Sequence, residues 1–403
     1  MNRYIALVTV AALLVGCQTM KDDTPRARTA PDVDDAQLAK SIAGPERIVA
    51  RIEPVALFRG PMPTGVAVSR EGRLFVNFPR WGDPVEFTVA EVRNGKAVPF
   101  PSAEINKLQT TGQADSLISV QSVVVDARDR LWILDTGSIN FQPVNAGGPK
   151  LLCVDLKTNE IVKRIPFPGN VALPTTYLND VRFDLSRGKE GMAFITDSSD
   201  SGPNGIIVVD LATGESWRKL HDHPSTKADQ NFVPTVEGKP LMAREPKQPE
   251  AYIKIGSDGI AIDPKNKLLY YCPLESHKLY SVSLDALADR DMKDEQVAQT
   301  VQDLGVREFA SDGLECDDQG RLYLTDYENN AIRRRNTDGR YEIIAQDPRM
   351  IWPDSMAIGT DGWLYFTANQ LNRQPRFHEG YDLRQQPYAV FRTRIGAQPV
   401  AMR

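Results

Sequence analysis

The sequence predicts an all-β protein, a six-bladed β-propeller, and two observations carry this prediction. A short pattern that opens with a polar residue recurs six times, and each copy is followed by a turn and a second apolar segment. The copies open with Thr64, Gln121, Asn179, Asp258, Asp312 and Asp354. In a propeller the first strand of every blade lines one central channel, so these residues are predicted to meet at one mouth of that channel.

Each repeat reads as strand, turn, strand. The first segments alternate apolar and other residues, as in Val66 and Val68, and the second are rich in Val, Ile, Leu and Tyr. The turns between them carry Asp and Gly, and we assign Asp184, Asp263, Asp317 and Asp361 to these turns. The body, residues 48–403, gives roughly 59 residues per repeat, enough for four strands.

Three segments depart from the repeat. Residues 388–395 read as a closing strand, and 48–58 are predicted to complete its blade. Residues 285–299 form the one convincing helical candidate. Between Asn179 and Asp258 the spacing grows to 79 residues, and the Pro-rich segment 221–250 is predicted to be a loop near the channel mouth.

The N-terminus is predicted to lie outside the fold. Residues 1–17 combine Arg3, a short apolar stretch and Leu14-Val15-Gly16-Cys17, the pattern of a bacterial lipoprotein signal peptide with Cys17 as the lipidated residue. A plain signal peptide is the alternative. Residues 18–47 are polar and predicted to be a flexible tether. By resemblance to Gram-negative sorting patterns, Gln18 favours the outer membrane, so membrane contact would be through the lipid anchor only.

Composition excludes some classes of protein. Of 403 residues 41% are hydrophobic and 25% charged, the net charge is −5, and no basic face suggests nucleic acid as a partner. The body has three cysteines, Cys153, Cys272 and Cys316, which allow at most one disulfide. The sequence has no Cys-x-x-Cys pair, so a zinc site built on cysteine is not expected. The sequence leaves the oligomeric state open.

The six leading residues are the candidate site. Three carboxylates and a carboxamide in a narrow ring require a bound cation, protonation or basic partners. A hard divalent cation, of which calcium is the favoured candidate, would take oxygen ligands from Asn179, Asp258, Asp312 and Asp354. Two alternatives stay open: these residues cap strand starts, or they form a polar pocket for a small molecule without metal, with Thr64 and Gln121 contributing. Asp180 adds a second carboxylate beside Asn179. Serine-hydrolase and phosphate-loop motifs are absent from the sequence.

Several segments resemble the yellow / major royal jelly protein family. They are Leu134-Asp-Thr-Gly137, Tyr177-Leu-Asn-Asp-Val-Arg-Phe-Asp184, Phe194-Ile-Thr-Asp197, Asp258-Gly-Ile-Ala-Ile-Asp-Pro264, Leu269-Tyr-Tyr-Cys-Pro-Leu274 and the run from Asp354 to Leu371. The resemblance implies a secreted six-bladed propeller. Members of that family differ in function: some convert dopachrome, some salivary members bind biogenic amines in the channel, and royal jelly members bind sterol or serve as nutrients.

A more distant resemblance is to the senescence-marker / gluconolactonase propellers, which are metal-dependent lactone hydrolases. Asn179 and Asp258 match their Asn-Asp and Asp-Gly contexts, whereas Thr64 stands where they have a metal-binding Glu. Three functions follow as hypotheses: binding of a small aromatic or amine ligand, with or without dopachrome conversion; metal-dependent lactone hydrolysis with Asp258 or Asp180 as the base; and a non-enzymatic scaffold in the cell envelope.

Overall fold

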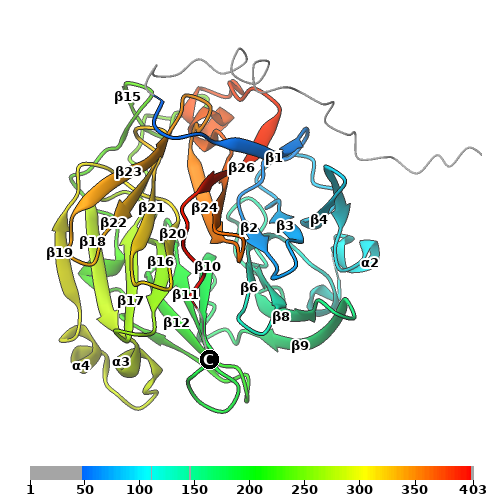
Figure 1. The fold of residues 1–403 in the computed structure, drawn as a ribbon, viewed down its shortest axis with the longest axis vertical. Coiled ribbons are helices and arrows are strands. Elements are labelled where there is room, and N and C mark those ends of the chain that lie inside the picture. The colour runs from blue at the N-terminus through cyan, green and yellow to red at the C-terminus, as the bar shows by residue number, and fades with distance from the viewer. Residues whose placement is uncertain (1–47, 110, 145–146, 401–403) are drawn as a thin grey trace, which may run out of the picture.

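The computed structural model describes residues 48–109, 111–144 and 147–400. Six four-stranded antiparallel sheets surround a central axis, which confirms the predicted six-bladed propeller (Figure 1). The predicted signal peptide with Cys17 and the tether 18–47 lie outside the described residues.

The first two strands of every blade coincide with the two segments of each sequence repeat. The innermost strands are β2 (Val66–Val68), β6 (Val120–Val125), β10 (Leu178–Asp184), β16 (Ser257–Asp263), β20 (Leu314–Cys316) and β24 (Pro353–Ile358). The second strands are β3 (Leu74–Asn77), β7 (Arg130–Asp135), β11 (Met192–Asp197), β17 (Leu268–Pro273), β21 (Leu322–Asp326) and β25 (Trp363–Ala368). The outer pairs are β4 (Val89–Arg93) with β5 (Lys96–Pro99), β8 (Lys150–Asp155) with β9 (Glu160–Pro166), β12 (Gly205–Asp210) with β13 (Ser216–Lys219), β18 (Lys278–Ser283) with β19 (Gln302–Val306), and β22 (Ala331–Arg335) with β23 (Tyr341–Gln346).

The two ends of the described body close the ring. Strand β1 (Glu53–Phe58) pairs antiparallel with β26 (Tyr388–Arg394), and β26 pairs with β25, so the last blade has the order β1-β26-β25-β24. This confirms the predicted joining of residues 48–58 to the closing strand. Because one blade holds both ends, opening the ring would break a complete strand ladder.

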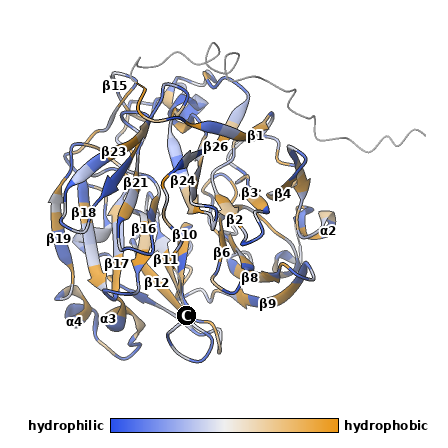
Figure 2. Cartoon of the chain, in the orientation of Figure 1, coloured by the Kyte–Doolittle hydropathy of each residue, from blue (hydrophilic) through white to orange (hydrophobic). Residues whose placement is uncertain are grey.

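The core lies between neighbouring blades. Strand β12 is hydrophobic over most of its length and colours orange accordingly (Figure 2). Trp132 of β7 stacks on Phe183 of β10 with the ring centroids 4.9 Å apart, which joins the second and third blades. Since the faces of successive sheets pack in this way around the axis, the inner strands are held in fixed positions around the channel.

Two glycines allow neighbouring inner strands to approach closely. A Cβ on Gly313 would lie 2.3 Å from the Asp354 carbonyl oxygen, and one on Gly259 would lie 2.2 Å from that of Asp312. Real side chains do not tolerate such distances, so the glycines that follow Asp258 and Asp312 in the repeat are required for packing at the axis.

We expect Gly313→Ala to lower the free energy of unfolding by about 1–3 kcal/mol, because the new methyl group must push the Asp354 backbone away. Gly169→Ala is the matched control, since a Cβ there has nothing within 4 Å. Urea unfolding of both variants measures the difference. Equal stability of the two variants would contradict this packing argument.

Three details differ from the sequence prediction or complete it. The helical candidate 285–299 is two short helices, α3 (Leu284–Ala288) and α4 (Asp294–Ala298), because Asp289 turns the chain by accepting the backbone N–H groups of residues 291 and 292. A further short helix, α2 (Ala103–Asn106), was not predicted.

Cys153, Cys272 and Cys316 are all buried free thiols. None of the helices in the described part of the chain is both long and apolar enough to cross a membrane.

Candidate functional site

Five of the six leading residues of the repeats line one cavity at a mouth of the channel, and Thr64 does not. Four of the six inner strands carry a shift in register at this point, in β6, β10, β16 and β24. Side chains of a regular strand point alternately to its two faces, and a bulge interrupts this alternation and re-aims a side chain. Here the bulges direct leading residues toward the channel axis.

Threonines of the second strands form hydrogen bonds with backbone groups at and beside the leading residues. The Thr325 hydroxyl accepts the N–H groups of Asp312 and Gly313, both at 3.0 Å. The Thr196 hydroxyl accepts the N–H of Asp180 at 3.2 Å and donates to the Asp258 carbonyl at 2.7 Å, across two blades. The ring is therefore fixed by hydrogen bonds within and between blades.

One cavity collects five of the six leading residues. Gln121, Asn179, Asp258, Asp312 and Asp354 line it together with apolar and aromatic side chains from loops on the same face. The other lining residues are Trp81, Phe141, Tyr177, Ser198, Leu241, Ile253, Ile255, Leu274, Glu275, Trp352, Leu371, Gln374, Arg376 and Phe377. About 40 Å³ of this cavity is open to the centre of a water molecule.

Asp258 and Asp312 form a hydrogen-bonded carboxyl pair. Burial raises the pKa of both groups, well above its usual value for Asp258 and to about 7 for Asp312, and Asp258 is the protonated partner that donates to Asp312. The Asn179 amide donates to Asp258 Oδ1 at 2.6 Å, and the Trp352 indole donates to Asp312 Oδ2 at 2.7 Å. The pair thus holds a proton near neutral pH within a nearly dry site.

Asp354 completes the acidic side of the cavity. Its carboxyl accepts from the Asn369 amide at 2.7 Å and from the Ser355 hydroxyl at 3.2 Å. Burial, and then the nearby Asp312 and Asp180, raise the pKa of Asp354 well above its ordinary value. The repulsion predicted for the ring is therefore met in this structure by protonation and by neutral hydrogen-bond donors.

An aromatic wall faces these carboxyl groups. Trp81 stacks on Phe141 with the centroids 5.3 Å apart, and Phe141 lies 4.8 Å from Tyr177. The Trp81 indole donates to the Tyr177 hydroxyl at 2.8 Å, and that hydroxyl donates to Gln121 Oε1 at 3.1 Å. Asp197 at the end of β11 accepts the Tyr177 backbone N–H at 3.0 Å, which fixes the segment carrying this ring.

Two more ionisable groups reach the cavity. Glu275 accepts the Ile255 N–H at 2.7 Å, its other oxygen has no partner among the described residues, and burial raises its pKa to about 8. The Arg376 guanidinium lies over Phe141 and Phe377, 5.6 and 5.0 Å from the ring centroids, and burial lowers its pKa. The cavity therefore contains four carboxyl groups and one guanidinium.

The segment 221–250 covers part of the mouth, in agreement with its predicted place. Its hairpin of β14 (Thr235–Val236) and β15 (Lys239–Pro240) brings Leu241 to the cavity. Glu237 in that hairpin accepts hydrogen bonds from Arg373 at 2.5 Å and Asn372 at 2.8 Å. These contacts attach the segment to the loop that carries Arg376.

Two predicted site residues lie elsewhere. Thr64 is fully buried, where its hydroxyl accepts from the Asn77 amide at 2.8 Å and donates to the Gln121 carbonyl. The Asp180 carboxyl lies among Ser122 and Arg182 and does not line the cavity. Together with burial, the charge of Asp180 nevertheless raises the pKa of Asp258, Asp312 and Asp354, so its predicted role beside them stays a prediction.

Sequence reasoning missed the aromatic wall and Glu275. Trp81, Phe141 and Glu275 follow the second strand of their blades by a few residues, and in a propeller these connections lie on the same face as the leading residues. Tyr177 precedes Asn179 by two positions. Aromatic or acidic residues a few positions after the second strand of a blade, or just before its leading residue, could therefore have been predicted to line the mouth.

The donor chemistry of the ring fits a hard cation in part. Carboxylate and amide oxygens are calcium ligands, and the predicted ligands Asn179, Asp258, Asp312 and Asp354 are among the side chains that line the cavity. Within residues 48–109, 111–144 and 147–400, however, no three His, Cys, Asp or Glu side chains are grouped so as to hold a metal ion. In this geometry Asn179 directs its N–H rather than its oxygen at Asp258, so a cation would have to displace these hydrogen bonds.

Fold and site together define a propeller with a covered acidic and aromatic channel mouth, and comparison with known proteins places it in a family. The family model "Major royal jelly protein" matches residues 118–395, and the chain belongs to this family. Major royal jelly protein 3 of Apis mellifera is 28% identical over 225 residues, 54% of this chain and 38% of that protein. The chain thus spans well under two thirds of that relative.

Two further comparisons bear on the architecture. Yellow-related salivary protein SP03 of Phlebotomus perniciosus is 26% identical over 329 residues, 76% of this chain and 78% of the salivary protein. A gluconolactonase of Xanthomonas campestris superposes with a TM-score of 0.50 at 12% identity, covering 92% of this chain and 98% of that one. At this identity the second likeness shows the propeller fold alone.

Proposed function

We propose that the channel mouth binds a small aromatic amine. The observation that carries this proposal is that stacked aromatic side chains and buried carboxyl groups line the same cavity. Trp81, Phe141 and Tyr177 offer ring faces to an aromatic body, and Asp258 with Asp312 offers a counter-charge to an ammonium group.

The charges at the site favour a cation once the carboxyl pair is ionised. Because the pKa of Asp312 is about 7 and that of Glu275 about 8, both groups lose protons as the pH rises through neutrality. An ammonium ion that takes the place of the shared proton gains two negative partners in a site of low polarity. Amine affinity is therefore expected to rise between pH 6 and 8.

Entry of such a ligand requires the cover to move. The space open in the cavity, about 40 Å³, suits water rather than an aromatic ring. Leu241 from the segment 221–250 and Leu371 and Phe377 from the last blade are the apolar side chains that would be displaced.

Isothermal titration with serotonin, dopamine and tyramine tests the proposal. We expect saturable binding of at least one amine, and no binding of 3-(4-hydroxyphenyl)propanoate, which keeps the ring and reverses the charge. Absence of heat with all three amines at pH 8 would refute amine binding.

Dopachrome conversion is the finer proposal for the same site. Tautomerisation moves a proton between two positions of one substrate, and a carboxyl pair with one protonated member can both give and take that proton. Asp258 and Asp312 are the residues placed to do so. The test is loss of dopachrome absorbance with time, compared between the native protein and Asp258→Asn.

Metal-dependent lactone hydrolysis is the second proposal. It rests on the oxygen donors Asn179, Asp258, Asp312 and Asp354 at the mouth, with a cation supplying Lewis acidity toward a carbonyl. Elemental analysis of the purified protein, with calcium titration at pH 6 and 8, tests it. This function would be excluded if the purified protein retained no divalent cation and if a chelator left its lactone hydrolysis unchanged.

Export is proposed for the chain as a whole. Its relatives include proteins described as salivary and as royal jelly proteins, which agrees with an extracellular location at a coarse level. Anchoring through a lipid on Cys17 is proposed from the sequence pattern alone. Metabolic labelling with a clickable fatty acid, abolished in Cys17→Ser, is the expected result.

A further inference from the structure

A second cavity lies at the opposite end of the channel, where the inner strands end. It contains about 150 Å³ open to the centre of a water molecule. Its apolar wall is made by Val66, Val123, Val125, Ile262, Met356 and Ile358. Residues 399 and 400 close one side, where the preceding Gln398 carbonyl accepts the Asp318 N–H at 3.0 Å. Cavity size and lining thus describe an enclosed, mainly aliphatic site.

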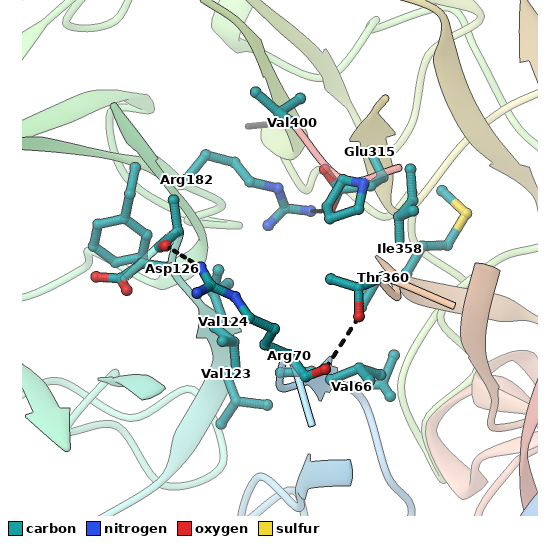
Figure 3. A pocket seen from close by; sticks show the side chains of 18 of the residues that line it. Val66, Arg70, Val123, Val124, Asp126, Arg182, Glu315, Ile358, Thr360 and Val400 are labelled. Atoms are coloured by element: carbon teal, nitrogen blue, oxygen red, sulfur yellow. Dashed lines mark hydrogen bonds and ion pairs between the residues drawn. The ribbon is translucent and has the colours of Figure 1, made fainter. Parts of the chain in front are cut away.

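Two arginines extend into this cavity from different blades (Figure 3). Arg182 of β10 is 7% exposed and donates to the Leu314 carbonyl at 2.6 Å and the Val181 carbonyl at 2.9 Å. Its Nε–H is buried and has no partner among the described residues. Arg70, from the turn between β2 and β3, donates to the Ala127 carbonyl at 2.9 Å and keeps the rest of its guanidinium available. An unpaired buried donor of this kind is costly unless something occupies it.

The acidic side chains at this end are already engaged. Asp126 accepts from Arg130 and from the Trp132 indole, and Asp129 accepts the Arg70 backbone N–H at 2.7 Å. Glu315 accepts the Cys316 N–H at 3.0 Å and lies 3.5 Å from Arg182, while burial raises its pKa and so favours its neutral form. The acidic side chains are therefore held by other groups of the protein, while the guanidinium of Arg70 keeps N–H donors free at the cavity.

We propose that this lower cavity binds a small aliphatic monocarboxylate. The carboxylate accepts from the free N–H groups of Arg70, and from Arg182 Nε once that side chain shifts to expose it, and such charge-assisted hydrogen bonds are the strong kind. The hydrocarbon part packs on the valine, isoleucine and methionine side chains. A cavity of this volume holds a molecule of about the size of benzene, so an acid of roughly five or six carbons fits. The site is separate from the channel mouth and does not depend on the function proposed there.

Calorimetric titration of the full chain with 3-methylbutanoate tests the proposal, with 3-methylbutan-1-ol as the uncharged analogue. We expect saturable binding of the acid and at least tenfold weaker binding of the alcohol. Arg70→Ala removes an exposed side chain and is expected to weaken acid binding about tenfold. Arg182→Lys keeps the charge but deletes the unpaired Nε–H and is expected to weaken binding by a similar factor.

Arg128→Ala is the matched control, because this exposed arginine lies in the turn beside Asp126 but does not line the cavity. It is expected to bind the acid like the native protein. Failure of the native protein to bind 3-methylbutanoate, equal affinity for acid and alcohol, or an equal loss in Arg128→Ala and Arg70→Ala would overturn the proposal.

Discussion

Replacing Asp312 by asparagine is expected to stabilise the protein at pH 8 by about 2–4 kcal/mol and to flatten the dependence of its stability on pH. In the folded state burial raises the pKa of this carboxyl to about 7, whereas an unfolded aspartate titrates near 3.9. The folded protein therefore holds a proton that the unfolded chain releases. The free energy of unfolding then falls as the pH rises from about 4 to 7.

Asparagine preserves the geometry of the pair. Its carbonyl oxygen can accept from the Trp352 indole, as Asp312 Oδ2 does at 2.7 Å. Its amide group can donate to the carbonyl oxygen of the protonated Asp258, which reverses the hydrogen bond between the two side chains. The titration of residue 312 is removed. Glu275, with its pKa raised to about 8, leaves a residual slope of the same sign in the variant.

Urea unfolding between pH 5 and 8.5 measures this effect. Asp303→Asn is the control, because Asp303 is an exposed residue of β19, the outermost strand of its blade. Its curve is expected to run parallel to that of the native protein. An Asp312→Asn curve that also runs parallel would show that the carboxyl pair does not hold its proton as described.

Trp81→Ala is expected to weaken binding of an aromatic amine by roughly 30-fold or more, since tryptophan side chains that contact a ligand are typical hot spots. Trp81 is half-buried, stacks on Phe141 and orients the Tyr177 hydroxyl, so its loss removes one ring face and loosens another. Trp81→Phe keeps the ring face and is expected to lose only a few-fold.

Calorimetric titration of tyramine against these variants gives the comparison. Trp363→Ala serves as the control, because this half-buried tryptophan lies under Arg392 and Arg394 on the last blade, away from the cavity. Native affinity in Trp81→Ala, or an equal loss in Trp363→Ala, would show that the aromatic wall does not contact the ligand.

The fold could be predicted from sequence because the signal repeats. Each blade begins with a polar residue that is followed by an alternating strand and a turn. A wrong strand assignment in one repeat is therefore corrected by comparison with the other repeats. Closure by residues 48–58 followed from the same count. The helical candidate 285–299 was wrong in extent because its interruption depends on one side chain, Asp289, which caps a turn within an otherwise helical pattern.

The site could be predicted only in part. The repeat identified the ring, but it gave all six leading positions the same role. The Thr64 hydroxyl instead accepts a hydrogen bond from the Asn77 amide and does not reach the cavity. The shared proton of Asp258 and Asp312 follows from burial, which sequence spacing does not report. The aromatic wall comes from loops of different blades, and only the tertiary structure brings Trp81 and Phe141 beside Tyr177.

A crystal structure of the protein soaked with tyramine at pH 8 would show whether and how the channel mouth binds an amine. We expect density for the ring against Trp81, Phe141 and Tyr177, with the ammonium nitrogen within hydrogen-bond distance of Asp258 or Asp312. Density for a cation coordinated by Asn179, Asp258, Asp312 and Asp354, or a mouth that stays closed and empty at saturating tyramine, would contradict this expectation.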